Sequence, residues 1–474
     1  MTAPRIHRQT IPFPDDLERV ILALGDAPFP FLLESGLRRD RLGRYSILGA
    51  DPFQVMTSCG REIVIRRGDA IERHEGNPFD ALREQLARFD LPPQDDAPFF
   101  AGAVGYLAYD LGQFVERLPQ TTLDDIGLPE MALAFHDTAA VFDHETGEAL
   151  IVAADLSLPQ REKPAARAER LAALIESPPA PKQSEATSSA PCDIACNFTR
   201  DEYLRALQRT KDYIASGDIF QANISRRFET ALTFSPAGLY ARLRRINPAP
   251  MAALLQFEEG AVISASPERF LKVTGRHVET RPIKGTRPRG ESEEADRRLA
   301  DELIASEKDN AELAMIVDLE RNDLGRVCNY GTVRVTEPRA LESYPTVHHL
   351  VATVEGDLHP RHDRVDLLKA SFPGGSITGA PKIRAMEIID ELEPTRRSVY
   401  TGAIGYLGFD GNMDLSIVIR TFIARGGRLF FQAGGGIVAD SEPDAEYDET
   451  GHKARALIEA VGGAGETATA SESH

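Results

Sequence analysis

Apolar and polar positions alternate along this chain with both helical and strand periods. An amphipathic run extends from Thr199 to Gly217 and opens with Thr199-x-x-Glu202, the spacing of a helix capping box. Ser235-Pro236 predicts the start of another helix, because proline suits the first helical position. A third helix is predicted in KDNAELAMIVDLERNDLGRV (308–327). Its buried side is marked by Leu313, Ile316, Val317 and Leu324.

Short apolar runs between these helices predict β-strands. The clearest examples are MAALLQF (251–257), AVISAS (261–266), FLKVTG (270–275) and HVETRPI (277–283). The order of helices and strands is neither a strict βαβ alternation nor all-β. The pattern therefore favours an α/β protein, of the α+β or layered type.

One apolar pattern occurs twice. GAVGYLAYD (102–110) and GAIGYLGFD (402–410) share their glycines and an aromatic residue in the same order, and each predicts a strand that runs into a turn. After the second copy, Asp410-Gly411 predicts the turn and residues 412–424 a returning strand. We interpret this repeated sequence pattern as a duplication within the fold. Chance similarity between two apolar strands is the alternative.

Two segments lack any aliphatic period. Residues 177–191, SPPAPKQSEATSSAP, predict a flexible linker, and residues 463–474 predict a disordered tail. The chain then divides into an N-terminal lobe (1–176) and a larger C-terminal region (192–462).

Composition narrows the class of protein. The chain has 474 residues, with 42% hydrophobic and 27% charged residues, which are globular values. Its net charge of −19 argues against binding to nucleic acid or to anionic membranes. We find no apolar run of membrane-spanning length and no signal core. The four cysteines are too scattered for a disulfide framework, so we expect a cytoplasmic enzyme.

Candidate chemistry begins at Lys284, in RPIKGTRPRG (281–290). Nearby cations lower the pKa of a lysine and free its amine as a nucleophile. Arg281, Arg287 and Arg289 are the neighbouring cations in the sequence. The alternative is a solvated basic loop.

Acidic groups form a second candidate. Pro443 suits a first helical turn, and Glu446, Glu449 and Lys453 would then lie on one helical face. Such a face could hold a hard cation and an anion together, although exposed salt bridges are its commoner meaning. Residues 434–436 just before it are all glycine, so their backbone N–H groups could cradle a carboxylate.

Three further positions are weaker. Glu312 lies one residue before the buried side of its predicted helix. The loop SFPGGSITGAPK (371–382) lacks the Lys-Ser/Thr of a nucleotide phosphate loop, so only a small-anion role is open to it. His349 lies on a strand-like run, where a packed histidine is the simpler interpretation.

Taken together, these segments resemble the chorismate-utilising enzymes, which include anthranilate synthase, isochorismate synthase and aminodeoxychorismate synthase. The resemblance covers most of 192–462 and is looser before residue 176. It rests on SPERF (266–270), PIKGTRPRG (282–290), EKDNAELAMIVDLERNDLGRV (307–327), HHLVAT (348–353), SFPGGSITGAPKIRAMEIIDELEP (371–394), YTGAIGYLGFDGNMDLSIVIRT (400–421) and FQAGGGIVADSEPDAEYDET (431–450), and on FLLES (31–35), RYSILGADP (44–52) and PFFAGAVGYLAYD (98–110).

The resemblance implies a four-layer α/β/β/α sandwich with two packed sheets, internal repeats and intertwined lobes. Lys284 stands where anthranilate synthases carry alanine and the aminodeoxychorismate branch carries lysine, and FQANISRRF (220–228) also looks like that branch. The implied reaction is conversion of chorismate and ammonia to 4-amino-4-deoxychorismate, toward 4-aminobenzoate and folate. Anthranilate formation is the alternative.

The resemblance also implies roles for single residues. Glu312 and Glu446 match glutamates that bind Mg²⁺, with Glu449 beside them. Lys284 would attack chorismate covalently, Glu268 would act as general acid or base, and His349 would lie near the C4 hydroxyl. Groups that hold the substrate would be Thr378, Tyr406, Arg420, Gly434, Gly435, Gly436 and Lys453.

Two further expectations concern ligands. The chain shows no glutaminase motif, so the resemblance implies a separate glutamine amidotransferase subunit that supplies ammonia. Leu33, Glu34 and Ser35 match a segment that forms a tryptophan pocket in relatives. Residues 247–251 depart from the usual pocket pattern, and a plain buried strand is the alternative.

Overall fold

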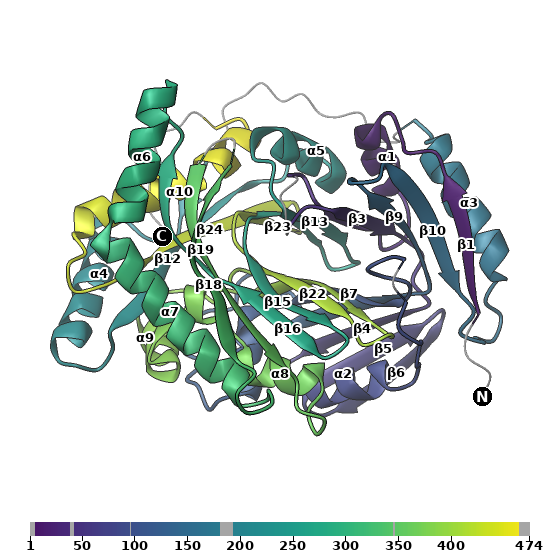
Figure 1. The fold of residues 1–474 in the computed structure, drawn as a ribbon, viewed down its shortest axis with the longest axis horizontal. Coiled ribbons are helices and arrows are strands. Elements are labelled where there is room, and N and C mark those ends of the chain that lie inside the picture. The colour runs from purple at the N-terminus through teal and green to yellow at the C-terminus, as the bar shows by residue number, and fades with distance from the viewer. Residues whose placement is uncertain (1–4, 38–41, 95, 181–192, 345–346, 464–474) are drawn as a thin grey trace.

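A computed structural model describes residues 5–37, 42–94, 96–180, 193–344 and 347–463. Its strands form two large antiparallel sheets, each of twelve strands among the described residues. The predicted mixed α/β class and the two packed sheets are confirmed (Figure 1). Residues 181–191 of the predicted linker (177–191) and residues 464–474 of the predicted tail (463–474) lie outside the described residues.

The first sheet joins strands from both halves of the chain. Its order is β1 (Ile6–Ile11), β10 (Glu148–Ala154), β9 (Thr138–Asp143), β3 (Tyr45–Gly49), β2 (Phe31–Glu34), β13 (Met251–Gln256), β14 (Ala261–Ser266), β23 (Thr421–Arg425), β24 (Arg428–Ile437), β12 (Gln221–Ala231) and β11 (Ala195–Cys196), with β20 (Gly379–Ala380) against β12.

The second sheet also joins strands from both halves of the chain. Its order is β17 (Ile283–Pro288), β19 (Val347–Asp357), β16 (His277–Arg281), β15 (Arg269–Thr274), β22 (Met413–Ile417), β21 (Ala403–Gly408), β7 (Gly102–Leu107), β8 (Met131–His136), β4 (Gln54–Cys59), β5 (Glu62–Arg67) and β6 (Ala70–Glu75), with β18 (Arg334–Ser343) against β19. The two halves of the chain are therefore intertwined, while a lobe boundary at 177–191 stays a prediction.

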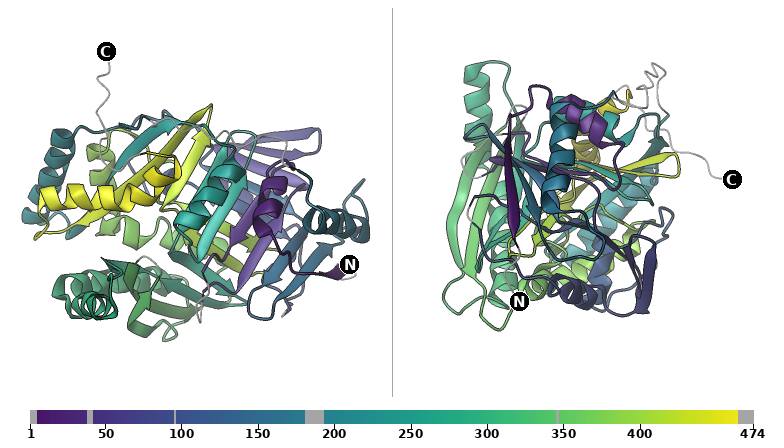
Figure 2. Two further views of the ribbon diagram at one scale, coloured as in Figure 1. Left: turned by 90° about the horizontal axis from the view of Figure 1, so that it is seen from above. Right: turned by 90° about the vertical axis from the view of Figure 1, so that its right-hand side faces the viewer.

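Helices cover the outer faces of both sheets, which gives four layers. The left view of Figure 2 shows α10 in yellow and α7 in green on opposite sides. Contacts place α1 (Leu17–Leu24), α3 (Pro164–Glu176), α4 (Arg200–Ala215), α5 (Pro236–Ile246), α9 (Lys382–Leu392) and α10 (Pro443–Ala460) on the first sheet. The second sheet carries α2 (Pro78–Leu86), α6 (Glu293–Ala305), α7 (Glu307–Gly325) and α8 (Arg364–Ser371), and the 3-10 turns are η1 (Tyr109–Phe114) and η2 (Gly375–Ile377).

Local signals in the sequence explain where these helices begin. At α4, Thr199 Oγ1 accepts from the Glu202 N–H at 3.2 Å and Glu202 Oε2 accepts from the Thr199 N–H at 2.8 Å, so the predicted capping box is confirmed. Ser235 caps α5, and Pro443 begins α10, as predicted. None of the helices in the described part of the chain is long and apolar enough to cross a membrane.

Strand alternation divides the core. Leu255 and Val262 of neighbouring strands pack between the sheets, whereas Leu254 and Ile263 pack under the helices of the first sheet. The duplicated segments lie side by side, because β7 pairs with β21 and places Gly105 opposite Gly405.

One predicted strand is wrong. Residues 412–424 were expected as a single returning strand, but β22 belongs to the second sheet and β23 to the first. The chain crosses between the sheets at Val418–Arg420, where Arg420 has a φ of 53°, which ends an extended strand.

Candidate functional site

Lys284 occupies a bulge at the edge of the second sheet. β17 pairs with β19, and the register shifts between Lys284 and Thr286. Gly285 has a φ of +76°, and a Cβ there would lie 2.8 Å from Leu303 and 3.0 Å from Asp309. Only glycine fits this position, and the bulge re-aims the strand beside Lys284.

The Lys284 amine is buried against two backbone segments. Its Nζ donates to Ser376 O of η2 at 3.0 Å, and a Cβ built on Gly436 would lie 3.5 Å from Nζ. Burial lowers the pKa of Lys284, while Glu312 and Glu268 oppose the shift. The amine is thus held close to the glycine strand β24, and its lowered pKa makes loss of the proton easier than in an exposed lysine.

The cause of this lowered pKa differs from the sequence-based expectation. Arg281, Arg287 and Arg289 are each neutralised by a carboxylate. The ion pairs are Arg281–Glu342 at 2.8 Å, Arg287–Asp309 at 3.0 Å and Arg289–Asp296 at 2.6 Å. The expectation that these cations depress the pKa of Lys284 is therefore wrong, because desolvation dominates the shift.

Glu268 lies beside Lys284 and is buried. Its Oε1 accepts weakly from the Ile283 N–H at 3.5 Å. Burial raises the pKa of Glu268 to about 7, against the opposing effects of Ser376 and Lys284. A carboxyl group with this pKa is partly protonated near neutral pH, which suits a general acid.

His349 and Arg420 lie near these groups, and we call Lys284, Glu268, His349 and Arg420 the Lys284 cluster. The His349 Nδ1 lies 2.9 Å from Thr286 Oγ1, and burial followed by the charge of Arg420 lowers the pKa of His349 to about 3. The imidazole is therefore neutral. Burial also lowers the pKa of Arg420, whose guanidinium has no hydrogen-bond or ion-pair partner among the described residues. A desolvated cation without a partner suits a ligand carboxylate.

Helix α10 brings its acidic face against β24, as the helical spacing predicts. Lys453 Nζ lies 2.7 Å from Glu449 Oε1 and donates to Gly434 O at 3.0 Å. Glu446 Oε1 accepts from Ser441 Oγ at 2.7 Å. A Cβ at Gly435 would lie 3.1 Å from Glu446 Oε2, so the glycine keeps the carboxylate close to the strand.

Lys308 stands between the two glutamates expected to bind metal. Its Nζ lies 4.0 Å from Glu312 and 3.6 Å from Glu446, and its side chain is 49% exposed. Across the described ranges, no three acidic, histidine or cysteine side chains are grouped closely enough for a metal site. The pair nonetheless fits a hard cation, since two carboxylates already share one positive charge.

Sequence reasoning missed the polar residues of β12. Gln221 and Asn223 lie on one face of this strand, and Asn223 pairs with Gly436. Both amide atoms of Gln221 are buried without a hydrogen-bond partner in the described structure, as is Asn223 Oδ1. The sequence did carry a signal for these residues, because polar residues alternate along β12, which pairs with the three consecutive glycines of β24.

Two expected ligand groups are placed differently. Thr378 is buried in the loop beside η2, but its hydroxyl donates to Gly374 O at 2.9 Å and so stabilises the loop itself. Tyr406 does not join the Lys284 cluster. It packs against Phe99, with ring centroids 5.3 Å apart, on the wall of a cavity that does not include Lys284. The tyrosine near Arg420 is Tyr400, because the Arg420 charge opposes the rise that burial causes in the pKa of Tyr400.

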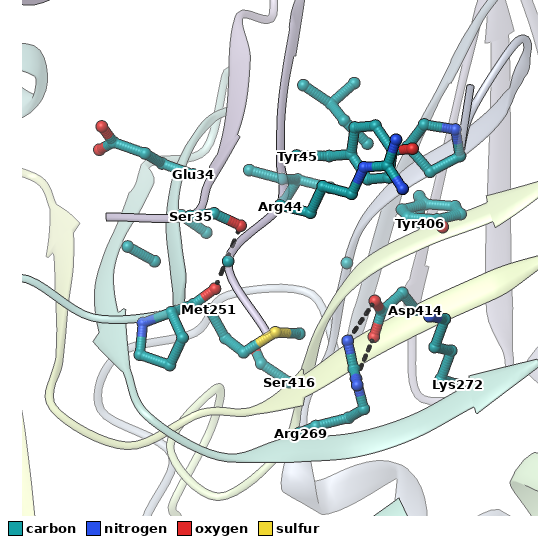
Figure 3. A pocket seen from close by; sticks show the side chains of 18 of the residues that line it. Glu34, Ser35, Arg44, Tyr45, Met251, Arg269, Lys272, Tyr406, Asp414 and Ser416 are labelled. Atoms are coloured by element: carbon teal, nitrogen blue, oxygen red, sulfur yellow. Dashed lines mark hydrogen bonds and ion pairs between the residues drawn. The ribbon is translucent and has the colours of Figure 1, made fainter. Parts of the chain in front are cut away.

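The cavity that Tyr406 lines has a volume of about 720 Å³ and does not include Lys284. It is lined by the segment Leu33–Ser35, as the resemblance implies, together with Tyr406, Met251 and an Arg269–Asp414 pair at 3.0 Å (Figure 3). The Glu34 carboxylate points away from it, toward Arg244 at 2.5 Å. Glu34 therefore contributes backbone, and not charge, to the cavity.

Comparison with known proteins decides the family. The family model described as "chorismate binding enzyme" matches residues 37–459. The chain belongs to the chorismate-binding enzymes. It is 44% identical to anthranilate synthase component 1 of Thermus thermophilus over 96% of this chain and 98% of that protein. It is 42% identical to aminodeoxychorismate synthase component 1 of Bacillus subtilis over 91% of each.

Solved structures support this family assignment. Anthranilate synthase component I from Streptococcus pneumoniae superposes with a TM-score of 0.78 at 34% identity, covering 88% of this chain and 93% of that one. The isochorismate synthase MenF from Escherichia coli has the same fold, with a TM-score of 0.70 at 18% identity over 97% and 95%.

Proposed function

We propose that this chorismate-binding enzyme is an aminodeoxychorismate synthase component I. It would convert chorismate and ammonia to 4-amino-4-deoxychorismate and water, toward 4-aminobenzoate and folate. The observation that carries the proposal is the buried Lys284 amine, which donates to Ser376 O at 3.0 Å beside the glycine strand and Glu268. A nucleophilic lysine at this place has no role in a purely structural site.

The proposed reaction has two displacements. The Lys284 amine, in its deprotonated form, attacks C2 of chorismate, both ring double bonds shift, and the C4–O bond breaks while Glu268 delivers a proton, so that water leaves. Ammonia then attacks C4, both double bonds shift back, and the C2–N bond to Lys284 breaks, while the new ammonium group returns a proton to Glu268. The net change replaces a hydroxyl by an amino group and regenerates the lysine.

Chorismate carries two carboxylates, and the site offers cations and N–H groups for them. Arg420 has no partner among the described residues, and Tyr400 lies near it. Lys453 is fixed against Gly434 O at 3.0 Å. These groups would orient the ring so that C2 faces Lys284, with neutral His349 near the C4 hydroxyl.

Mg²⁺ is the proposed cofactor. Glu312 and Glu446 would hold it in place of the Lys308 ammonium that now lies between them, with Glu449 nearby. When bound, the ion supplies positive charge against the substrate carboxylate. The half-exposed Lys308 side chain is free to withdraw into solvent.

Ammonia would come from a partner. The relatives from Bacillus subtilis and Thermus thermophilus are both named as component 1, which implies a second component in each. For this chain we propose a glutamine amidotransferase subunit and a cytoplasmic location. The cavity lined by Leu33 and Ser35 is the proposed tryptophan pocket.

Anthranilate synthase component I is the second candidate, favoured by the 44% identity to the Thermus thermophilus protein. Product identification separates the two. The protein is incubated with chorismate, Mg²⁺ and an ammonium salt, and the products are resolved by chromatography. We expect 4-amino-4-deoxychorismate, whereas fluorescent anthranilate as the main product would overturn the proposal.

A further inference from the structure

A completely buried ion pair lies behind the Lys284 cluster. Arg397 and Glu393 are each 1% exposed in their side chains, with Nη2–Oε1 at 2.7 Å and Nε–Oε2 at 2.9 Å. Desolvating two charges costs free energy that their attraction only partly offsets, so such a pair is weak evidence for stability. What a bidentate pair does supply is a fixed geometry.

The remaining donors and acceptors of this pair bind mainly backbone groups, together with the Ser225 and Thr401 hydroxyls. Arg397 Nη1 donates to Ile377 O at 3.0 Å, and Arg397 Nη2 donates to Asn223 O at 2.5 Å. Glu393 Oε1 accepts from Ser225 N at 2.9 Å and from Ser225 Oγ at 2.8 Å. The pair therefore ties the η2 turn to strand β12 and to the loop that follows α9.

The η2 turn is also the support of the reactive groups. Lys284 Nζ donates to Ser376 O at 3.0 Å, one peptide before the carbonyl that Arg397 holds. The Ser376 side chain interacts with Glu268. Only the two backbone dihedrals of Ile377 separate these carbonyls, and both belong to the short η2 turn, so a shift of the Ile377 carbonyl should also move that of Ser376.

The same arginine also lies near the groups proposed to bind the substrate carboxylates. Its guanidinium carbon lies 5.8 Å from the ring centroid of Tyr400 and 4.8 Å from that of Tyr109. Tyr400 in turn lies near Arg420. One side chain thus contacts the segments that carry both the lysine side and the carboxylate side of the site.

We propose that Arg397, locked by Glu393, is a positioning residue that sets the Ser376 carbonyl and thereby the direction of the Lys284 amine. The inference rests on the proposed role of Lys284 as nucleophile. A lysine could keep the charge at 397, but it lacks the planar fork that reaches Glu393, Ile377 and Asn223 together.

The test compares Arg397→Lys with Arg167→Lys. Arg167 is also buried, and it donates to Thr138 Oγ1 at 2.9 Å and to Ala154 O at 2.6 Å in the N-terminal half. Steady-state kinetics with chorismate and ammonium salt give kcat and KM, and thermal unfolding gives the stability of each variant. Competitive acetylation followed by mass spectrometry measures the reactivity of Lys284 relative to the exposed Lys163.

We expect Arg397→Lys to lower kcat by about a hundredfold with a much smaller change in KM, because a misdirected nucleophile is penalised in the chemical step. The relative acetylation of Lys284 should change at the same time. Arg167→Lys should reduce the unfolding temperature without moving either readout. If Arg397→Lys, like Arg167→Lys, leaves kcat per folded enzyme and Lys284 acetylation at their wild-type values, the proposal is wrong.

Two more variants cover a failure of Arg397→Lys to fold. Glu393→Gln keeps an acceptor for Ser225 but loses the charge that locks Arg397, and it should show the same split between kcat and KM. Arg397→Gly should recover activity when millimolar guanidinium chloride is added, whereas Arg167→Gly should not. Absence of both effects in folded protein overturns the proposal. Lys284 acetylation is read independently of the product, so an anthranilate product would overturn the proposed function and leave the positioning role standing.

Discussion

Lys284 Nζ donates to the carbonyl oxygen of Ser376 at 3.0 Å, and this bond joins the second sheet to the η2 turn. It aims a buried amine at the glycine strand. Replacing Lys284 by alanine should lower kcat by about 10³-fold, equivalent to about 4 kcal/mol in the activation free energy. The assay is 4-amino-4-deoxychorismate formation at saturating ammonium.

Lys382→Ala is the control for that change. Lys382 is also largely buried and forms an ion pair with Asp323 at 2.6 Å, between α9 and α7. Its loss should destabilise the fold more than it slows the reaction. A Lys284→Ala variant as fast as wild type would refute the covalent step, as would failure to trap any lysine-linked adduct.

The pKa of Glu268 predicts a pH dependence. Because burial raises this pKa to about 7, the carboxyl is protonated below pH 7 and ionised above it. A general acid must be protonated, so kcat should fall as pH rises through about 7. Glu268→Gln should be slow and should lose this alkaline limb. A limb that persists in Glu268→Gln would assign it to another group.

Mg²⁺ dependence should respond to Lys308. Because the Lys308 ammonium lies between Glu312 and Glu446, it competes with a cation for these carboxylates. Lys308→Ala should therefore lower the Mg²⁺ concentration that gives half-maximal activity, and Glu446→Gln should raise it. Lys163→Ala, which changes an exposed residue, should leave this Mg²⁺ concentration unchanged. An unchanged Mg²⁺ requirement in Lys308→Ala would contradict this account.

Substitutions of Tyr400 and Tyr406 should distinguish the proposed chorismate site from the cavity that Tyr406 lines. Tyr400 lies beside Arg420, so Tyr400→Phe should raise KM for chorismate several-fold. Tyr406 lines the cavity that includes Leu33 and Ser35, so Tyr406→Phe should leave KM unchanged. Tryptophan should raise the unfolding temperature of the wild type, and substitution of Tyr406 by alanine should remove that shift. A raised KM for chorismate in Tyr406→Phe, with an unchanged KM in Tyr400→Phe, would instead place Tyr406 in the chorismate site.

Gly285 should be far less replaceable than Gly275. Both have positive φ, +76° and +61°, but a Cβ at 285 would lie 2.8 Å from Leu303 and one at 275 has nothing within 4 Å. Gly275→Ala should cost about 1 kcal/mol from backbone strain alone. Gly285→Ala should cost about 1–3 kcal/mol more, because the neighbouring side chain must move. Urea unfolding of both variants checks the difference.

Many elements could be predicted because their signals are local. The capping box at Thr199 and Glu202, the proline that begins α10 and the alternation in β13 and β14 each depend on residues within one or two turns of chain. The motifs around Lys284 and Glu446 likewise lie in contiguous segments, so the resemblance to chorismate-utilising enzymes was visible in the sequence and the family match confirms it.

The tertiary structure decided what depends on distant partners. The sequence by itself determined that Lys284, Glu268 and the α10 acids are candidate groups, but not which tyrosine joins them. Tyr406 and Tyr400 are six residues apart, but Tyr406 lies on β21 and lines the cavity that includes Leu33, whereas Tyr400 lies in the turn before β21, near Arg420. The lowered pKa of Lys284 likewise comes from burial by β24 and η2, since its sequence neighbours Arg281, Arg287 and Arg289 are paired elsewhere. Desolvation and strand pairing are non-local, so they become visible only when the two sheets are assembled.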